Sequence, residues 1–285
     1  MSLYVRPADL GEALRARFDH PDWMVLAGGT DLMVDAPRRA VPTGILDLWR
    51  LSPLVGIETR IAGSGGDASW IRIGAGTTWR ETIASPTVQQ HVPILASAAR
   101  EIGALQIQAR GTVGGNLGTS SPVGDSLPVW LALDAELELA SVRGARRVRY
   151  ADYCTGYRKT ALAADELIVA AWVPVPSAAT KLCWRKVGTR RAQSISKVMA
   201  AAAITIEGGT ITAARIGLGA VADRPIRAPA AEAALVGKPP GPEAAAAAAA
   251  ALGGAIRPIN DVRSTADYRL DVARNVVARF VLASY

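Results

Sequence analysis

Two short glycine-containing segments carry the residue types best suited to binding a ligand. Residues 27–31 read Ala-Gly-Gly-Thr-Asp, and residues 112–116 read Thr-Val-Gly-Gly-Asn. Glycine allows the backbone to approach a ligand closely, and successive exposed amides form a concave anion site that needs no lysine or metal. Either segment alone is more typical of an ordinary turn than of a ligand site. Together they predict one phosphate-bearing cofactor held from two sides.

Other chemistry-bearing motifs are absent or out of context. Residues 217–222 formally match the dinucleotide fingerprint with alanine last, but Asp223-Arg224-Pro225 follows them where a helix must begin. Residues 74–79 lack the third small residue, and no glycine loop is followed by Lys-Ser or Lys-Thr. A nicotinamide Rossmann domain and a P-loop are therefore excluded.

Metal chemistry and nucleic-acid binding are also disfavoured. The two cysteines, Cys154 and Cys183, and the two histidines, His20 and His91, are too few and too scattered for a zinc site or an iron-sulfur cluster. The net charge of +7 is spread in short clusters without interleaved aromatics, which favours solubility, an anionic cofactor or an acidic partner subunit. Neither a secretory signal nor a membrane span is recognisable, so we expect a cytoplasmic protein.

The elements that must position the glycine segments are readable from hydrophobic periodicity. The 285 residues suit two domains. A helix over 8–18 capped by Asp9, a strand over 23–27, a short helix over 32–37 and a strand over 44–48 predict a β-α-β unit in the first 55 residues. The first glycine segment directly follows the strand over 23–27.

The remaining pattern predicts an antiparallel hairpin, more helices and a second domain. The hairpin pairs residues 55–58 with 70–74 around the loop 62–67. One helix is predicted to begin near residue 78, and another to cover residues 93–102. Strands over 135–141 and 146–150 precede a domain break near 178, because Pro174 and Pro176 interrupt any continuing strand. The second domain is predicted to contain three strands, over 183–187, 200–207 and 211–218, and two helices, over 228–235 and 270–283. The alanine run 244–251 predicts a surface helix without specific packing.

Five segments together resemble a known family. They are residues 27–31, residues 111–116, the Ser-Pro-Val-Gly-Asp-Ser-Leu-Pro segment 121–128, the basic segment 185–196 and the C-terminal segment 261–269. In this order they resemble the FAD-binding medium subunit of the molybdenum hydroxylases, the xanthine dehydrogenase and carbon monoxide dehydrogenase family. The resemblance covers nearly the whole chain.

This resemblance implies an α+β fold in which a two-part FAD-binding domain of the vanillyl-alcohol-oxidase (PCMH) type precedes a smaller α+β domain. The first domain would span residues 1–177, with parts of about 1–55 and 56–177, and the second, of the carbon monoxide dehydrogenase flavoprotein type, residues 178–285. The implied FAD-binding residues are Leu26, Ala27, Gly28, Gly29, Thr30, Asp31, Leu32, Ile102, Gly103, Thr112, Gly114, Gly115, Asn116, Thr119, Asp125, Ile168 and Lys186.

Three of these residues are given roles near the flavin ring by the resemblance. Asp125 would accept the ring imide proton, Ile168 would pack against the ring, and Lys186 would be the catalytic residue, stabilising the reduced ring or an incoming nicotinamide. On sequence alone Asp125 is equally a loop turn, Ile168 a buried strand residue and Lys186 a solvated lysine at a sheet edge.

The family also implies partners. A small subunit would carry 2Fe-2S clusters and a large subunit the molybdenum cofactor, in a dimer of heterotrimers that passes electrons to NAD, a quinone, a cytochrome or oxygen. The carbon monoxide branch typically has His-Ser after the first Gly-Gly, whereas this chain has Thr30-Asp31, so an N-heterocycle or aldehyde is the expected substrate. A stand-alone flavin oxidase or reductase of the same fold and a colourless nucleic-acid-binding module are the alternatives.

Overall fold

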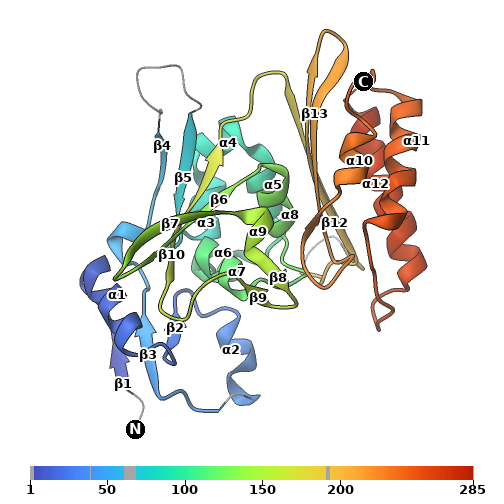
Figure 1. Ribbon diagram of the computed structural model, residues 1–285. Coiled ribbons are helices and arrows are strands. Elements are labelled where there is room, and N and C mark those ends of the chain that lie inside the picture. Colours follow the sequence, from blue (N-terminus) through green and yellow to red (C-terminus); the bar gives the residue numbers. More distant parts are fainter. Residues whose placement is uncertain (1–2, 39, 61–68, 191–192, 285) are drawn as a thin grey trace.

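In the described residues the chain forms sheets of three, five and four strands and a two-stranded ribbon, with helices packed around them, as Figure 1 shows. The computed structural model describes residues 3–38, 40–60, 69–190 and 193–284. Helices and strands alternate without a single repeating order, so the fold class is α+β, as predicted. We call β1 to β10 the first unit and β11 to α12 the second unit.

The first part of the chain forms a parallel sheet in the order β1-β3-β2. The strands are β1 (Leu3–Val5), β2 (Met24–Leu26) and β3 (Gly44–Asp47), with α1 (Leu10–Asp19), α2 (Leu32–Asp35) and the 3-10 turns η1 (Ala36–Arg38) and η2 (Ser52–Leu54) connecting and following them. The Asp9 carboxylate accepts a hydrogen bond from the Glu12 amide at 2.8 Å, which caps α1 as predicted. The predicted β-α-β unit is confirmed, and β1 completes it.

A five-stranded antiparallel sheet follows, in the order β4-β5-β10-β6-β7. Its strands are β4 (Ile57–Arg60), β5 (Trp70–Gly74), β6 (Glu136–Ser141), β7 (Gly144–Arg149) and β10 (Leu167–Pro174), beside a ribbon of β8 (Cys154–Gly156) and β9 (Lys159–Thr160). The predicted hairpin is confirmed, with Ile57 opposite Ile73, while its loop 62–67 lies outside the described residues. The helices of this part are α3 (Trp79–Ala84), α4 (Pro86–His91), α5 (Pro93–Arg100), α6 (Leu105–Arg110), α7 (Val113–Thr119), α8 (Leu127–Ala132) and α9 (Tyr150–Tyr153).

The second unit is a four-stranded antiparallel sheet in the order β11-β12-β13-β14 between two helical layers. The strands are β11 (Thr180–Val187), β12 (Val198–Glu207), β13 (Thr210–Gly219) and β14 (Ile226–Arg227), and the helices α10 (Pro229–Ala233), α11 (Pro242–Ala251) and α12 (Ala266–Leu282), with η3 (Leu252–Gly254). In Figure 1 these helices cover one face, while α5 and α8 of the first unit pack on the other. The two units therefore share a continuous packed interface.

Two sequence expectations about helices are wrong. The alanine run forms α11 with Ala246 exposed at the surface, but Ala244, Ala245 and Ala248 are buried in the hydrophobic core of the second unit, so the expected lack of specific packing is wrong. Residues 113–119 form the helix α7 in place of a second glycine turn. The Thr112 hydroxyl accepts from the Gly115 amide at 3.0 Å, and this cap starts a helix that glycine propensity alone disfavours.

Candidate functional site

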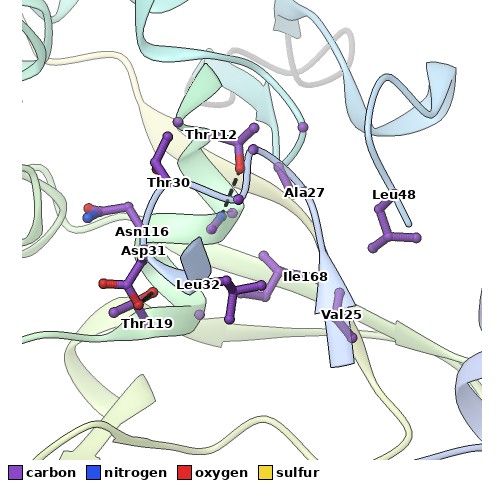
Figure 2. A pocket seen from close by; sticks show the side chains of 18 of the residues that line it. Val25, Ala27, Thr30, Asp31, Leu32, Leu48, Thr112, Asn116, Thr119 and Ile168 are labelled. Carbon is purple, nitrogen blue, oxygen red and sulfur yellow. Dashed lines mark hydrogen bonds between the residues drawn. The ribbon is translucent and has the colours of Figure 1, made fainter. Parts of the chain in front are cut away.

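A cavity of about 670 Å³ lies where the small parallel sheet meets β10 and α7. Figure 2 shows Thr30, Asp31, Asn116 and Thr119 gathered around it with Leu32 and Ile168. All but three of the predicted cofactor residues line this cavity: Ala27, Gly28, Gly29, Thr30, Asp31, Leu32, Ile102, Thr112, Gly114, Gly115, Asn116, Thr119, Asp125 and Ile168. Leu26, Gly103 and Lys186 do not line it. The fold therefore brings together two segments about 80 residues apart in sequence.

The first glycine segment presents unpaired backbone amides to the cavity. It connects β2 to α2, and a Cβ at Gly28 would lie 1.9 Å from the Arg110 carbonyl oxygen, so only glycine permits this approach. Gly29 has a φ of +76°. Within the described residues, no protein group accepts a hydrogen bond from the amides of residues 28–31. These residues are partly exposed and line the cavity, so their amides are available to an anionic ligand there.

The second glycine segment has a different role, because its amides are already bonded. The Val113 amide donates to the Thr77 carbonyl at 2.9 Å, and the Gly114 amide donates to the Ala75 carbonyl at 2.7 Å. A Cβ at Gly114 would lie 2.6 Å from the Ala75 Cβ, so this glycine allows α7 to pack closely. The expected second row of exposed amides is therefore absent from this part of the described chain.

Side chains of α7 contribute to the cavity in place of its amides. The Thr119 hydroxyl donates to Asp31 Oδ2 at 3.2 Å, which joins the two segments directly. Ser126 Oγ donates to Asn116 Oδ1 at 2.6 Å, an orientation that leaves the Asn116 amide nitrogen as a donor. Ile168 lies in β10, at a register irregularity in its pairing with β6, and its side chain lies near Gly118.

A carboxylate held from the second unit lies at one end of the cavity. Lys186 Nζ donates to Asp125 Oδ2 at 2.8 Å, and Ser196 Oγ donates to Asp125 Oδ1 at 2.8 Å. Burial raises the pKa of the Asp125 carboxyl, while the Lys186 ammonium and the Ser196 hydroxyl oppose this by stabilising the charged form. Lys186 therefore reaches the cavity only through Asp125.

Another part of the cavity wall combines apolar side chains with the cation of Arg17. This part includes Trp23, Val25 and Leu48, together with Arg17 from α1. The Arg17 guanidinium donates to the Trp23 carbonyl oxygen at 3.0 Å, while its Nε is buried and has no partner among the described residues. Burial lowers the pKa of Arg17. Sequence analysis did not identify these residues, since arginine on an amphipathic helix is normally solvated.

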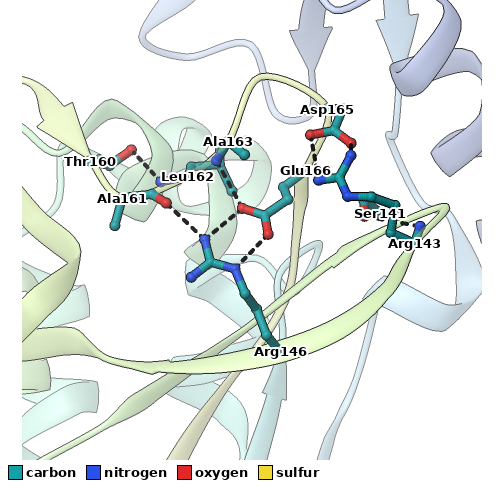
Figure 3. A network of polar contacts seen from close by, with 9 residues as sticks. All are labelled: Ser141, Arg143, Arg146, Thr160, Ala161, Leu162, Ala163, Asp165 and Glu166. Carbon is teal, nitrogen blue, oxygen red and sulfur yellow. Dashed lines mark hydrogen bonds and ion pairs between the residues drawn. The ribbon is translucent and has the colours of Figure 1, made fainter.

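A polar network fixes the loop before β10 that completes the wall, as Figure 3 shows. Glu166, a wall residue only 5% exposed, accepts from Arg146 Nε at 2.6 Å and from the Ala163 amide at 2.8 Å. The Arg146 guanidinium lowers the pKa of Glu166, and Arg143 pairs with the adjacent Asp165. The carboxylate is therefore held charged at the edge of the cavity.

The remaining exclusions concern metals, membranes and the dinucleotide motif. The described residues contain no cluster of histidine, cysteine or acidic side chains able to hold a metal ion, and none of their helices is long and apolar enough to span a membrane. Both cysteines are free thiols. Residues 217–219 end the antiparallel strand β13, so the fingerprint match is not a phosphate loop.

Comparisons with known proteins agree with this geometry. The model of the FAD-binding domain in molybdopterin dehydrogenase matches residues 1–176, and that of the carbon monoxide dehydrogenase flavoprotein C-terminal domain matches residues 185–284. The nicotine 6-hydroxylase medium subunit of Paenarthrobacter nicotinovorans is 31% identical over 98% of this chain and 95% of its own length. The carbon monoxide dehydrogenase medium chain of Afipia carboxidovorans is 32% identical over 98% of this chain and 94% of its own.

Solved structures show the same likeness over the full chain. A chain of carbon monoxide dehydrogenase from Hydrogenophaga pseudoflava superimposes with a TM-score of 0.91 at 34% identity, covering 99% of this chain and 98% of that one. A chain of quinoline 2-oxidoreductase from Pseudomonas putida 86 gives 0.90 at 31% identity, covering 100% and 96%.

Proposed function

The chain belongs to the FAD-binding medium subunits of the molybdenum hydroxylases, and we propose that it relays electrons within such an enzyme. It is thus the flavoprotein subunit of an oxidoreductase. In this proposal residues 1–177 form the FAD-binding domain, with parts of about 1–55 and 56–177, and residues 178–285 form the C-terminal domain. The second domain then supplies Lys186 to the first.

The proposed position of FAD rests on the backbone amides of residues 28–31, which have no protein acceptor among the described residues. A pyrophosphate is the dianionic part of FAD, and a row of amides without protein acceptors can bind it without a lysine. The cavity of about 670 Å³ lies within the usual range of about 300–1,000 Å³ for ligand sites. Thr30 and Thr119 would add hydroxyl donors, with Leu26 and Leu32 packing beside the segment. The residues present therefore fit the cofactor.

The two ends of the cavity suit the two ends of FAD. We place the flavin ring at the end with Asp125 and Ile168, where the carboxylate can accept a hydrogen bond from the ring imide N–H. Ile102 and Gly103 would then lie close to the ring. The adenosine half then lies beside the apolar side chains of Trp23 and Val25, where Arg17 has donor capacity left. In this orientation the flavin ring lies beside Asp125. Among the described residues that line the cavity, Asp125 is the only carboxylate with an ion pair to the second unit.

FAD, when bound, stores two electrons and releases them to an acceptor. The chain's own residues would orient it: the 28–31 amides hold the phosphates, Asp125 orients the ring, and Lys186 balances the carboxylate charge. Electrons would arrive from 2Fe-2S clusters in a small subunit, after oxidation of the substrate at molybdenum in a large subunit, and would leave to NAD, a quinone, a cytochrome or oxygen. A dimer of such heterotrimers is the proposed assembly.

The proposed substrate class is an N-heterocycle or an aldehyde. Thr30-Asp31 stands where the carbon monoxide branch typically has His-Ser. Relatives named for nicotine, quinoline and carbon monoxide all match this chain over nearly its full length, so the Thr30-Asp31 pair alone supports this choice. The choice of substrate would be made in the large subunit.

The absorption spectrum of the purified chain tests the proposal. We expect flavin bands after FAD is added, and iron and molybdenum in the complex copurified from its source. A chain that stays colourless with excess FAD would contradict the whole proposal. Tight flavin binding by a chain that copurifies with no partner and oxidises an organic substrate itself would favour the stand-alone oxidase.

A further inference from the structure

The Asp125 carboxylate is held by two side chains from the second unit. Lys186 from β11 bonds Oδ2 and Ser196, just before β12, bonds Oδ1, each at 2.8 Å. The Lys186 side chain is 6% exposed and Ser196 is 1% exposed, so water does not replace either bond. Each carboxylate oxygen is therefore fixed by one donor and keeps further acceptor capacity.

The backbone at Ser196 is itself fixed on two sides. The next amide, that of Lys197, donates to the Val187 carbonyl oxygen at 2.8 Å, and the Lys197 carbonyl accepts from Arg269 at 2.8 Å. Arg269 is 2% exposed and also bonds the Ala220 carbonyl at 2.9 Å. The hydroxyl is thus supported by β11 and α12 rather than by a free loop.

We propose that Ser196 is a positioning residue for the flavin ring, holding the Asp125 carboxylate in the rotamer that accepts a hydrogen bond from the ring imide N–H. The inference rests on the proposed function, because it requires FAD with its ring at Asp125. Two donors are needed: one bond fixes one oxygen, whereas bonds to both oxygens fix the plane of the carboxylate. The second unit would then set the flavin site's geometry as well as its charge.

The charged surroundings of Asp125 make this role measurable. Lys186 faces the carboxylate from β11, and Glu101 at the end of α5 adds a like charge. Glu101, Arg185 and Arg190 line a second hollow together with Lys186. Burial raises the pKa of Asp125, and the Ser196 hydroxyl is one of the groups that lowers it. Without this hydroxyl the carboxyl should take up a proton at higher pH and turn more freely.

The test compares Ser196→Ala, Ser196→Thr and a surface control, Ser177→Ala, in the full chain loaded with FAD. We expect Ser196→Ala to raise the FAD dissociation constant about three- to tenfold, the size of one lost hydrogen bond. The pH transition in the visible spectrum of bound FAD should move up by about one unit, and the flavin reduction potential should become more positive. Ser196→Thr should restore both values, and Ser177→Ala should match wild type.

The outcomes separate this inference from the function it rests on. A wild-type chain that binds no FAD overturns both. A Ser196→Ala chain with wild-type spectrum, potential and pH transition overturns the positioning role alone, provided Asp125→Asn changes them. If Ser196→Ala does not fold, Ser196→Cys, with a weaker donor of similar size, is measured against the same expectations.

Discussion

Replacing Gly114 with alanine should destabilise the FAD-free chain, whereas the same change at Gly115 should not. The two glycines are neighbours in α7, and both line the cavity. A Cβ at Gly114 would lie 2.6 Å from the Ala75 Cβ and 2.9 Å from its carbonyl oxygen. A Cβ at Gly115 would meet only the Thr112 hydroxyl, at 2.9 Å.

The expected magnitudes follow from opposing effects. Alanine gains about 1 kcal/mol over glycine inside a helix, and overpacking costs about 1–3 kcal/mol. At Gly114 backbone atoms of Ala75 must move, so the upper end applies and the net loss is about 2 kcal/mol, or about 4–8 °C in Tm. At Gly115 rotation of the Thr112 hydroxyl loses a cap of about 1 kcal/mol, which offsets the propensity gain.

Thermal unfolding followed by circular dichroism, with and without FAD, measures both effects. Gly115→Ala should keep the wild-type Tm without FAD but bind FAD more weakly, because its methyl group enters the cavity. Gly118→Ala, whose Cβ would lie 3.8 Å from the Ile168 side chain, is the matched control for Tm alone, because Gly118 also lines the cavity. A wild-type Tm for Gly114→Ala would refute the assignment of that glycine to helix packing.

Three further predictions concern other parts of the chain. Arg17→Met should raise the dissociation constant for FAD about three- to tenfold and leave that for FMN unchanged, as fluorescence titration would show; an equal effect on FMN would place Arg17 elsewhere. The Arg263 and Ser264 amides and Arg269 lower the pKa of Asp261 to about 2, against burial. The ionised Asp261 carboxylate therefore stabilises the folded chain fully above pH 3.8, its ordinary pKa, and this stabilisation is lost as the pH falls toward 2. Asp261→Asn should accordingly make the free energy of unfolding depend less on pH over that range. An unchanged pH dependence would contradict this. Ala248→Leu should lower the free energy of unfolding by about 1–3 kcal/mol through overpacking, and Tm with it, whereas Ala246→Leu on the exposed side should not. Equal Tm values for the two variants would contradict the buried packing of α11.

Local patterns predicted the elements that depend on nearby residues. The α1 cap at Asp9 and the hairpin of β4 and β5 were both readable from short segments. The strand β1 was missed because its three residues are stabilised by pairing with β3, about 40 residues away. The burial of α11 was missed because a run of alanines has no polar face to contrast with an apolar one.

The site was predictable only where one segment carries it. The segment 27–31 shows its glycines and polar side chains in sequence, while Ser196 reaches Asp125 across 71 residues and Arg17 reaches the cavity from an ordinary amphipathic helix. The resemblance to the family supplied Asp125 and Lys186, but their ion pair and its position between the two units required the structure.

Amide hydrogen bonding separates the glycines that can bind a ligand from those that pack. The Gly28 and Gly29 amides have no protein acceptor among the described residues, whereas the Gly114 amide bonds the Ala75 carbonyl. Gly217, which formally starts a dinucleotide fingerprint, lies in β13, and a Cβ there would be 2.1 Å from the Pro128 carbonyl oxygen of α8. The three glycine-containing motifs therefore have two physical roles: one can bind a ligand, and two allow close packing. Because glycine is the residue in all three, the hydrogen-bond partner of each backbone amide decides which motif can bind phosphate.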